Sequence, residues 1–157
     1  MEGVVQNLVA EACAKHGNDS SALLPVLLEL QERSGKHYVS REIAEEVARA
    51  LEVTPGQVFE VVTYFAALSD KPRGKYLIQI CESTACSVVG YNALLDWFKE
   101  ELGLEVGQTD ADGLFTLATT HCIGACDVAP AVRINNEVFG NLTREKVREL
   151  ISERRAG

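Results

Sequence analysis

The chain is poor in basic residues and has no long apolar run. Lys and Arg number 15 against 23 Asp and Glu, which gives a net charge of −8. That balance disfavours nucleic acid or an anionic membrane as a partner, because both attract cationic surfaces. No apolar run approaches the roughly 20 residues that cross a bilayer, and the first 17 residues lack the basic and apolar regions of a secretory signal. We therefore expect a cytoplasmic protein without direct membrane insertion.

Several familiar cysteine patterns and cofactor motifs are also missing. The odd total of five cysteines argues against a secreted disulfide framework. A thioredoxin-type dithiol needs CxxC and a 4Fe–4S ferredoxin needs C-x2-C-x2-C, and neither pattern occurs. There is no glycine-rich phosphate loop and no nucleophile–base set, so the sequence shows no NAD or flavin site of its own.

Four cysteines form two pairs, and they are the most informative residues present. Cys81 and Cys86 enclose CESTAC, Cys122 and Cys126 enclose CIGAC, and 35 residues separate the pairs. Four thiolates from two loops suit either a 2Fe–2S cluster or a structural zinc. The CxxxxC and CxxxC gaps are wider than the CxxC knuckles of most zinc sites, which favours iron and sulfide without excluding zinc. Gly124 and its small neighbour would let the chain wrap closely around a cluster and offer it N–H groups.

Residues 1–70 carry the period of amphipathic helices. Apolar stripes over residues 5–12, 23–31, 43–51 and 58–68 predict four helices. Ser40 is placed to cap the third, and Thr54 with Gln57 forms a capping box at the start of the fourth. A polar stretch with Pro and Gly at 69–74 ends this half.

Residues 75–157 change to a mixture of strands and helices in the order β-α-β-β-β-α. Strands are predicted at 75–81, 114–120, 131–134 and 137–139, and helices at 88–102 and 143–154. Each cysteine pair follows one of the first two strands. The expected fold is therefore α+β: an N-terminal helical bundle followed by an α/β domain at 75–157, a small sheet with helices packed on it.

The cysteine segments CESTACSVVG and HCIGACDVAPAVRIN, with GQTDADGLFTL between them, closely resemble the NADH dehydrogenase 24-kDa subunit family. The likeness extends into the helical half through LLPVLLELQ and LEVTPGQVFEVVTYF. Members of that family are thioredoxin-like 2Fe–2S proteins. One departure is Ala85, because respiratory members often have proline before the second cysteine. The string T-A-C looks more like subunits of NAD(P)-linked hydrogenases and formate dehydrogenases.

This resemblance implies a cofactor, a ligand set and partners. Cys81, Cys86, Cys122 and Cys126 would ligate a 2Fe–2S cluster in a thioredoxin-like domain. The chain would be a one-electron carrier that is not catalytic alone. Its partners would be an FMN- and NAD(H)-binding flavoprotein subunit and further Fe–S subunits, with the helical residues 1–70 as the docking region. The parent complex would be respiratory complex I, an NAD-linked hydrogenase (with or without electron bifurcation) or a formate dehydrogenase.

Two other function classes compete with electron transfer. A zinc-stabilised interaction module would use the same four cysteines without redox activity. A DNA-binding accessory domain would use residues 40–67 as a helix-turn-helix, but 54–67 contain no Lys or Arg, which disfavours contact with phosphates. The fifth cysteine, Cys13, lies on an apolar helix face and is expected in the core. His121 is expected to be a non-ligand, because Rieske-type ligation needs two histidines on one iron.

Overall fold

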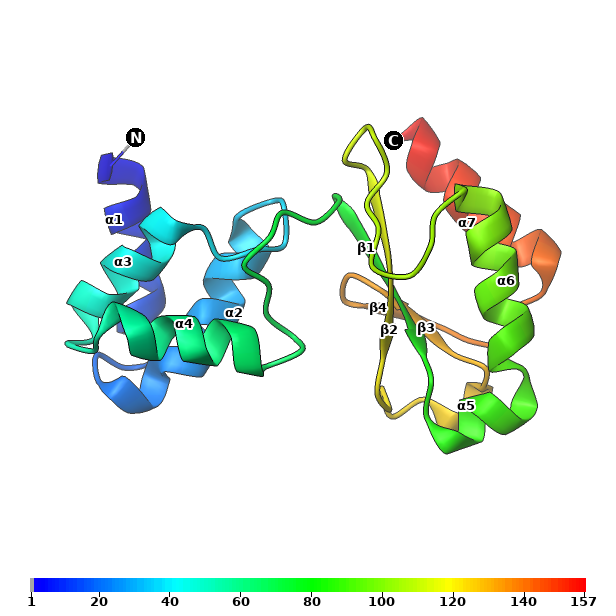
Figure 1. Cartoon of the computed structure of the whole chain (residues 1–157), viewed down its shortest axis with the longest axis horizontal. Coiled ribbons are helices and arrows are strands. Elements are labelled where there is room, and N and C mark those ends of the chain that lie inside the picture. Colours follow the sequence, from blue (N-terminus) through cyan, green and yellow to red (C-terminus); the bar gives the residue numbers. More distant parts are fainter. Residues whose placement is uncertain (1) are drawn as a thin grey trace. The chain divides into compact units, whose positions relative to one another are not determined.

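The computed structural model describes residues 2–157, and they divide into two compact units between Pro72 and Arg73 (Figure 1). Each unit has a hydrophobic core of its own. Together they give the α+β class that the sequence predicts. None of the helices within residues 2–157 is both long and apolar enough to cross a bilayer.

The first unit consists of helices. They are α1 (Glu2–His16), the short 3-10 turn η1 (Ser20–Ala22), α2 (Leu23–Arg33), α3 (Arg41–Ala50) and α4 (Pro55–Tyr64). The predicted caps are present. The Ser40 hydroxyl accepts the Ile43 N–H at 3.3 Å, and Thr54 and Gln57 exchange hydrogen bonds of 3.2 and 2.9 Å in a capping box.

The fourth helix is shorter than its apolar stripe suggested. It ends at Tyr64, and Leu68 enters the core from the loop that follows. The buried Gln31 side chain holds this loop in place, because its amide donates to Ala67 O and accepts from Ser69 N, both at 2.8 Å. The Gln31 side chain thus provides hydrogen-bond partners for backbone groups in the loop after the helix. The apolar period of the sequence does not reveal where the helix ends, because this contact comes from a distant residue.

The second unit is a four-stranded mixed sheet with the strand order β2-β1-β3-β4. Its strands are β1 (Tyr76–Cys81), β2 (Phe115–Thr120), β3 (Val132–Ile134) and β4 (Glu137–Phe139). β1 runs parallel to β2 and antiparallel to β3, and β3 and β4 form a hairpin. The turn of this hairpin contains Asn135 at φ +53°, a conformation that asparagine tolerates.

Two helices of the second unit, α6 (Tyr91–Leu102) and α7 (Arg144–Ala156), pack on one face of the sheet (Figure 1). The short helix α5 (Thr84–Val89) follows the end of β1, and its Cys86 packs with Cys81 and Ala131. The single helix predicted over 88–102 is wrong at its start: Gly90 at φ +147° separates α5 from α6, and Val88 is 82% exposed instead of belonging to the buried stripe. From α6 and α7, Phe98 and Ile151 reach Ile78 and Leu117 of the strands in one core.

Candidate iron–sulfur centre

The parallel pairing of β1 and β2 brings the two cysteine segments together. Cys81 is the last residue of β1 and lies opposite Thr120, the last residue of β2. One residue later, the Glu82 N–H still donates to Thr120 O at 2.9 Å. Because parallel strands end at the same edge of a sheet, the loops that follow begin side by side. The segments that follow Cys81 and Thr120 thus meet at one end of the second unit, which is called the pole here.

The first pair is buried. Cys81 is 2% and Cys86 is 1% exposed, and both pack against Ala131. The Cys81 N–H donates to Ala131 O at 3.1 Å, and a backbone hydrogen bond from Ala131 reaches the Cys86 thiol. Cys86 lies in the short helix α5, so one turn of helix returns the second thiol to the end of the strand.

The second pair is exposed and lies close together. The Sγ atoms of Cys122 and Cys126 are 3.9 Å apart, and no disulfide joins them. Two thiolates on one tetrahedral metal, with bonds of about 2.3 Å, lie about 3.8 Å apart. Gly124, at φ +79°, directs its N–H at Cys122 Sγ over 3.4 Å. This is the amide donation to sulfur expected of that glycine, and the spacing suits a shared metal ion.

Burial and contact with neighbouring thiols raise the pKa values of Cys86 and Cys126. Burial raises the pKa of Cys86, the Ala131 amide partly offsets this, and the Cys81 thiol raises it further. The pKa of Cys126 is raised first by its contact with Cys122, and then by burial and by Cys81 and Asp127. Thiolates form readily only beside positive charge, which a bound metal supplies. Cys81 thus raises the pKa of one cysteine in each pair, Cys86 in the first and Cys126 in the second.

The donor set fits a binuclear centre. In the described residues, no three Cys, His, Asp or Glu side chains form one preformed metal-binding group. Two adjacent thiol pairs are nonetheless the arrangement that two irons need, because each iron of a 2Fe–2S cluster takes two protein ligands. Four thiols with two directed amides match the sulfur ligation and the N–H donors of such clusters. The assignment of these four cysteines as ligands stays a prediction.

A close backbone approach fixes the second cysteine loop. The 3-10 turn η2 (Cys126–Val128) follows the pair, and the Asn141 N–H donates to Val128 O at 2.8 Å. A Cβ added to Gly140 would lie 2.4 Å from that same oxygen, so only glycine fits there. The Ala129–Pro130 bond, whose isomer the sequence leaves open, is cis. Sequence reasoning missed Gly140, because nothing in its local sequence reveals the loop it meets.

The sequence predicts that Cys13 and His121 are not cluster ligands. Cys13 is buried in the core of the first unit, and burial raises the pKa of its thiol, as expected for a structural cysteine. His121 is exposed beside Cys122.

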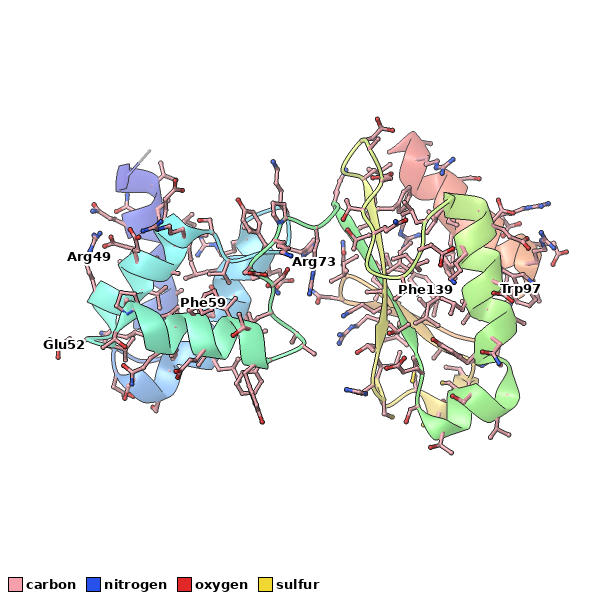
Figure 2. All side chains as sticks on the ribbon, in the orientation of Figure 1. Arg49, Glu52, Phe59, Arg73, Trp97 and Phe139 are labelled. Carbon is pink, nitrogen blue, oxygen red and sulfur yellow. The ribbon has the colours of Figure 1, made fainter. Side chains whose placement is uncertain are left out.

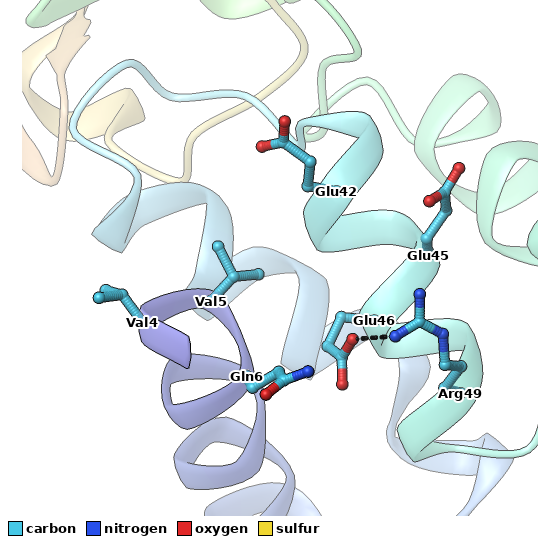
Figure 3. A pocket seen from close by; sticks show the side chains of 7 residues that line it. All are labelled: Val4, Val5, Gln6, Glu42, Glu45, Glu46 and Arg49. Carbon is cyan, nitrogen blue, oxygen red and sulfur yellow. Dashed lines mark hydrogen bonds and ion pairs between the residues drawn. The ribbon is translucent and has the colours of Figure 1, made fainter. Parts of the chain in front are cut away.

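A separate hollow lies between α1 and α3 (Figure 3). Its volume is about 630 Å³, and its lining includes Glu42, Glu45, Glu46 and Arg49. Glu46 pairs with Arg49 at 2.5 Å. An excess of carboxylates repels the phosphates of FMN or NAD, so this hollow does not suit either cofactor.

Comparison with known proteins identifies the class. The model of the thioredoxin-like 2Fe–2S ferredoxin family matches residues 9–155, and the chain belongs to that family. It is 32% identical over 155 residues to NADH-quinone oxidoreductase subunit 2 of Thermus thermophilus, covering 97% of this chain and 84% of that one. It is 36% identical over 116 residues to the NADP-reducing hydrogenase subunit HndA of Solidesulfovibrio fructosivorans, covering 74% and 68%.

A solved structure has the same fold. An NAD+-reducing NiFe hydrogenase in the air-oxidised state superimposes with a TM-score of 0.71 at 22% identity, over 83% of this chain. The match spans only 23% of the length of that hydrogenase chain. The thioredoxin-like fold and the resemblance to the 24-kDa subunit family are thereby confirmed, and family membership makes 2Fe–2S the cofactor.

We expect Cys122→Ser to lower the iron and sulfide content sharply, because a hydroxyl replaces one of the four thiolates. The matched control is Cys13→Ser, which changes the buried cysteine of the other unit and should leave iron, sulfide and visible absorption at wild-type levels. Iron and acid-labile sulfide per chain are the measurement. Full cluster content in Cys122→Ser would remove that residue from the ligand set.

Gly140→Ala should also lower cluster content, although Gly140 touches no thiol. The added methyl group meets Val128 and must displace the loop that holds Cys126. Gly56→Ala, whose new Cβ meets nothing closer than 3.8 Å, is the matched control and should retain the cluster. Equal iron content in the two variants, measured after identical anaerobic reconstitution, would show that this contact does not hold the loop.

Proposed function

We propose that this chain is a one-electron carrier subunit that exchanges electrons with the FMN of an NAD(P)(H)-binding partner. The observation that carries the proposal is the four-thiol pole at the end of a parallel strand pair in a ferredoxin fold. NADH yields two electrons together, a flavin can divide them, and a 2Fe–2S centre accepts one at a time. The chain's own residues hold the cluster, donate N–H groups to its sulfurs and limit access to it.

The relatives support a multi-subunit setting. Their names describe subunits of NADH-quinone oxidoreductase and of an NADP-reducing hydrogenase. We place this chain in a complex of that kind, together with a flavoprotein subunit and further Fe–S subunits. Respiratory complex I, an NAD-linked hydrogenase and a formate dehydrogenase all fit. The exposed pair Cys122 and Cys126 gives the partner an approach to the cluster that the buried pair does not.

The first unit offers a surface for docking the flavoprotein. α4 exposes Phe59, which is 59% exposed (Figure 2). Tyr64 is 82% exposed, and the ring of Phe65 packs edge-on against it with centroids 5.2 Å apart. Exposed aromatic residues on one helix are typical of protein interfaces. Residues 54–67 carry one acid and no base. The surface therefore suits an apolar partner surface.

In the native complex, NADH should reduce the 2Fe–2S centre of this chain by one electron, seen as bleaching of visible absorption and a new EPR signal. The isolated, iron-loaded chain should respond to dithionite and not to NADH, because hydride oxidation needs the flavin. Reduction of the isolated chain by NADH would contradict the proposal. Fully metallated protein that contains zinc and no iron would favour the interaction module.

The double substitution Phe59→Ser and Tyr64→Ser should weaken binding to the flavoprotein by about tenfold to a hundredfold, as loss of interface aromatic residues commonly does. Val4→Ser, which changes an exposed apolar residue of α1, is the control and should bind normally. Affinity would be measured by titration with the flavoprotein that co-purifies, and iron content would verify that the cluster is intact. Unchanged affinity of the double variant would exclude this face as the docking surface.

A further inference from the structure

One face of the sheet carries both a cluster cysteine and an arginine. Side chains alternate along a strand, so Gln79 and Cys81 of β1 lie on the face opposite to Ile78 and Ile80, which enter the helix-covered core. Ala131 lies on the same face, in contact with Cys81. Arg133 is two residues further along and lies opposite Gln79 in the antiparallel register.

Arg133 is held in place by Gln79. Its Nε and Nη2 both donate to Gln79 Oε1, at 3.1 and 2.7 Å. Gln79 is 7% exposed and Arg133 is partly buried, so the guanidinium is partly withdrawn from water. The Cα atoms of diagonal neighbours on one face of an antiparallel pair lie about 7–8 Å apart, and Arg133 and Cys81 are such neighbours. A positive charge held by Gln79 therefore lies on the same face of the sheet as the first thiol.

The rest of the pole is negative. Glu82 follows Cys81, Asp127 follows Cys126, and the segments 81–90 and 120–131 contain no Lys or Arg. With four thiolate ligands, an oxidised 2Fe–2S cluster carries a formal charge of about −2, and one added electron makes it about −3. In a partly buried site such charges interact through a lower dielectric than water. A cation on this face favours the reduced form.

We propose that Arg133, positioned by Gln79, raises the reduction potential of the cluster. The inference rests on the proposed cluster site. It concerns the reduction potential of the cluster and does not depend on which partner protein exchanges electrons with it. The step is the transfer of one electron to the cluster, with no bond formed or broken and no proton taken up by Arg133. The guanidinium stabilises the added negative charge through space.

The test is a dithionite titration of the purified, iron-loaded whole chain, with visible absorption and EPR as readouts. Arg133→Gln should lower the equilibrium constant for reduction by about tenfold, which is about 59 mV for a one-electron couple. Arg133→Lys keeps the charge and should recover most of that loss. Gln79→Leu frees the guanidinium and should lower the potential by a smaller amount, while the EPR line shape of the reduced centre stays that of wild type.

Arg154→Gln is the matched control. Arg154 is also partly buried, but it lies over the ring of Tyr76, at the opposite end of β1 from Cys81. Its removal changes the net charge by the same amount and should leave the potential unchanged. A wild-type potential in iron-loaded Arg133→Gln, or an equal shift in Arg154→Gln, would overturn the inference and leave the electron-carrier proposal intact. If Arg133→Gln holds no iron, the Gln79→Leu variant decides the question. A wild-type reduction potential of the cluster in Gln79→Leu would then overturn the inference.

Discussion

The parallel register between β1 and β2 is the constraint on which the site depends. It sets Cys81 opposite Thr120 and starts both cysteine loops at one edge of the sheet. A slip of one residue would turn Cys81 to the helix-covered face and bury Gln79 in the apolar core. The core itself resists that slip, because Ile78, Ile80 and Leu117 fill it in the observed register. The register that packs the apolar residues into the core is therefore the same register that brings the thiols together.

Electrostatics at the pole explains why the site suits a metal cluster and not free thiolates. The contact between neighbouring thiols and their burial raise the pKa values of Cys86 and Cys126. The Ala131 amide works in the opposite direction at Cys86, since it stabilises negative sulfur, but it does not overcome the effects of burial and of the Cys81 thiol. A bound metal would supply the remaining positive charge. The backbone is thereby arranged for the metal-bound state before the metal arrives.

Much of this arrangement could be predicted from local sequence. The capping box at Thr54, the strand that ends at Cys81 and the turn at Asn135 each have a signature within a few residues, and the structure has all three. What could not be predicted depends on distant contacts. The end of α4 is set by Gln31, more than 30 residues earlier. The break at Gly90 looks locally like a tolerated helical glycine. The four cysteines could be grouped by spacing, but their proximity depends on strand register, which no local pattern records.

The two thiol pairs differ in a way that bears on electron exchange. Cys81 and Cys86 are closed off by Ala131 and the sheet, whereas Cys122 and Cys126 lie on an exposed loop. A cluster held by both pairs would have one iron inside the protein and one near its surface. Burial disfavours added negative charge, and exposure allows water or a partner to stabilise it. Arg133 lies on the same sheet face as the buried Cys81, where solvent offers little compensation for added negative charge. An arginine at this position would therefore offset the cost of reduction on the buried side of the site, whereas the exposed side would need no such charge because water reaches it.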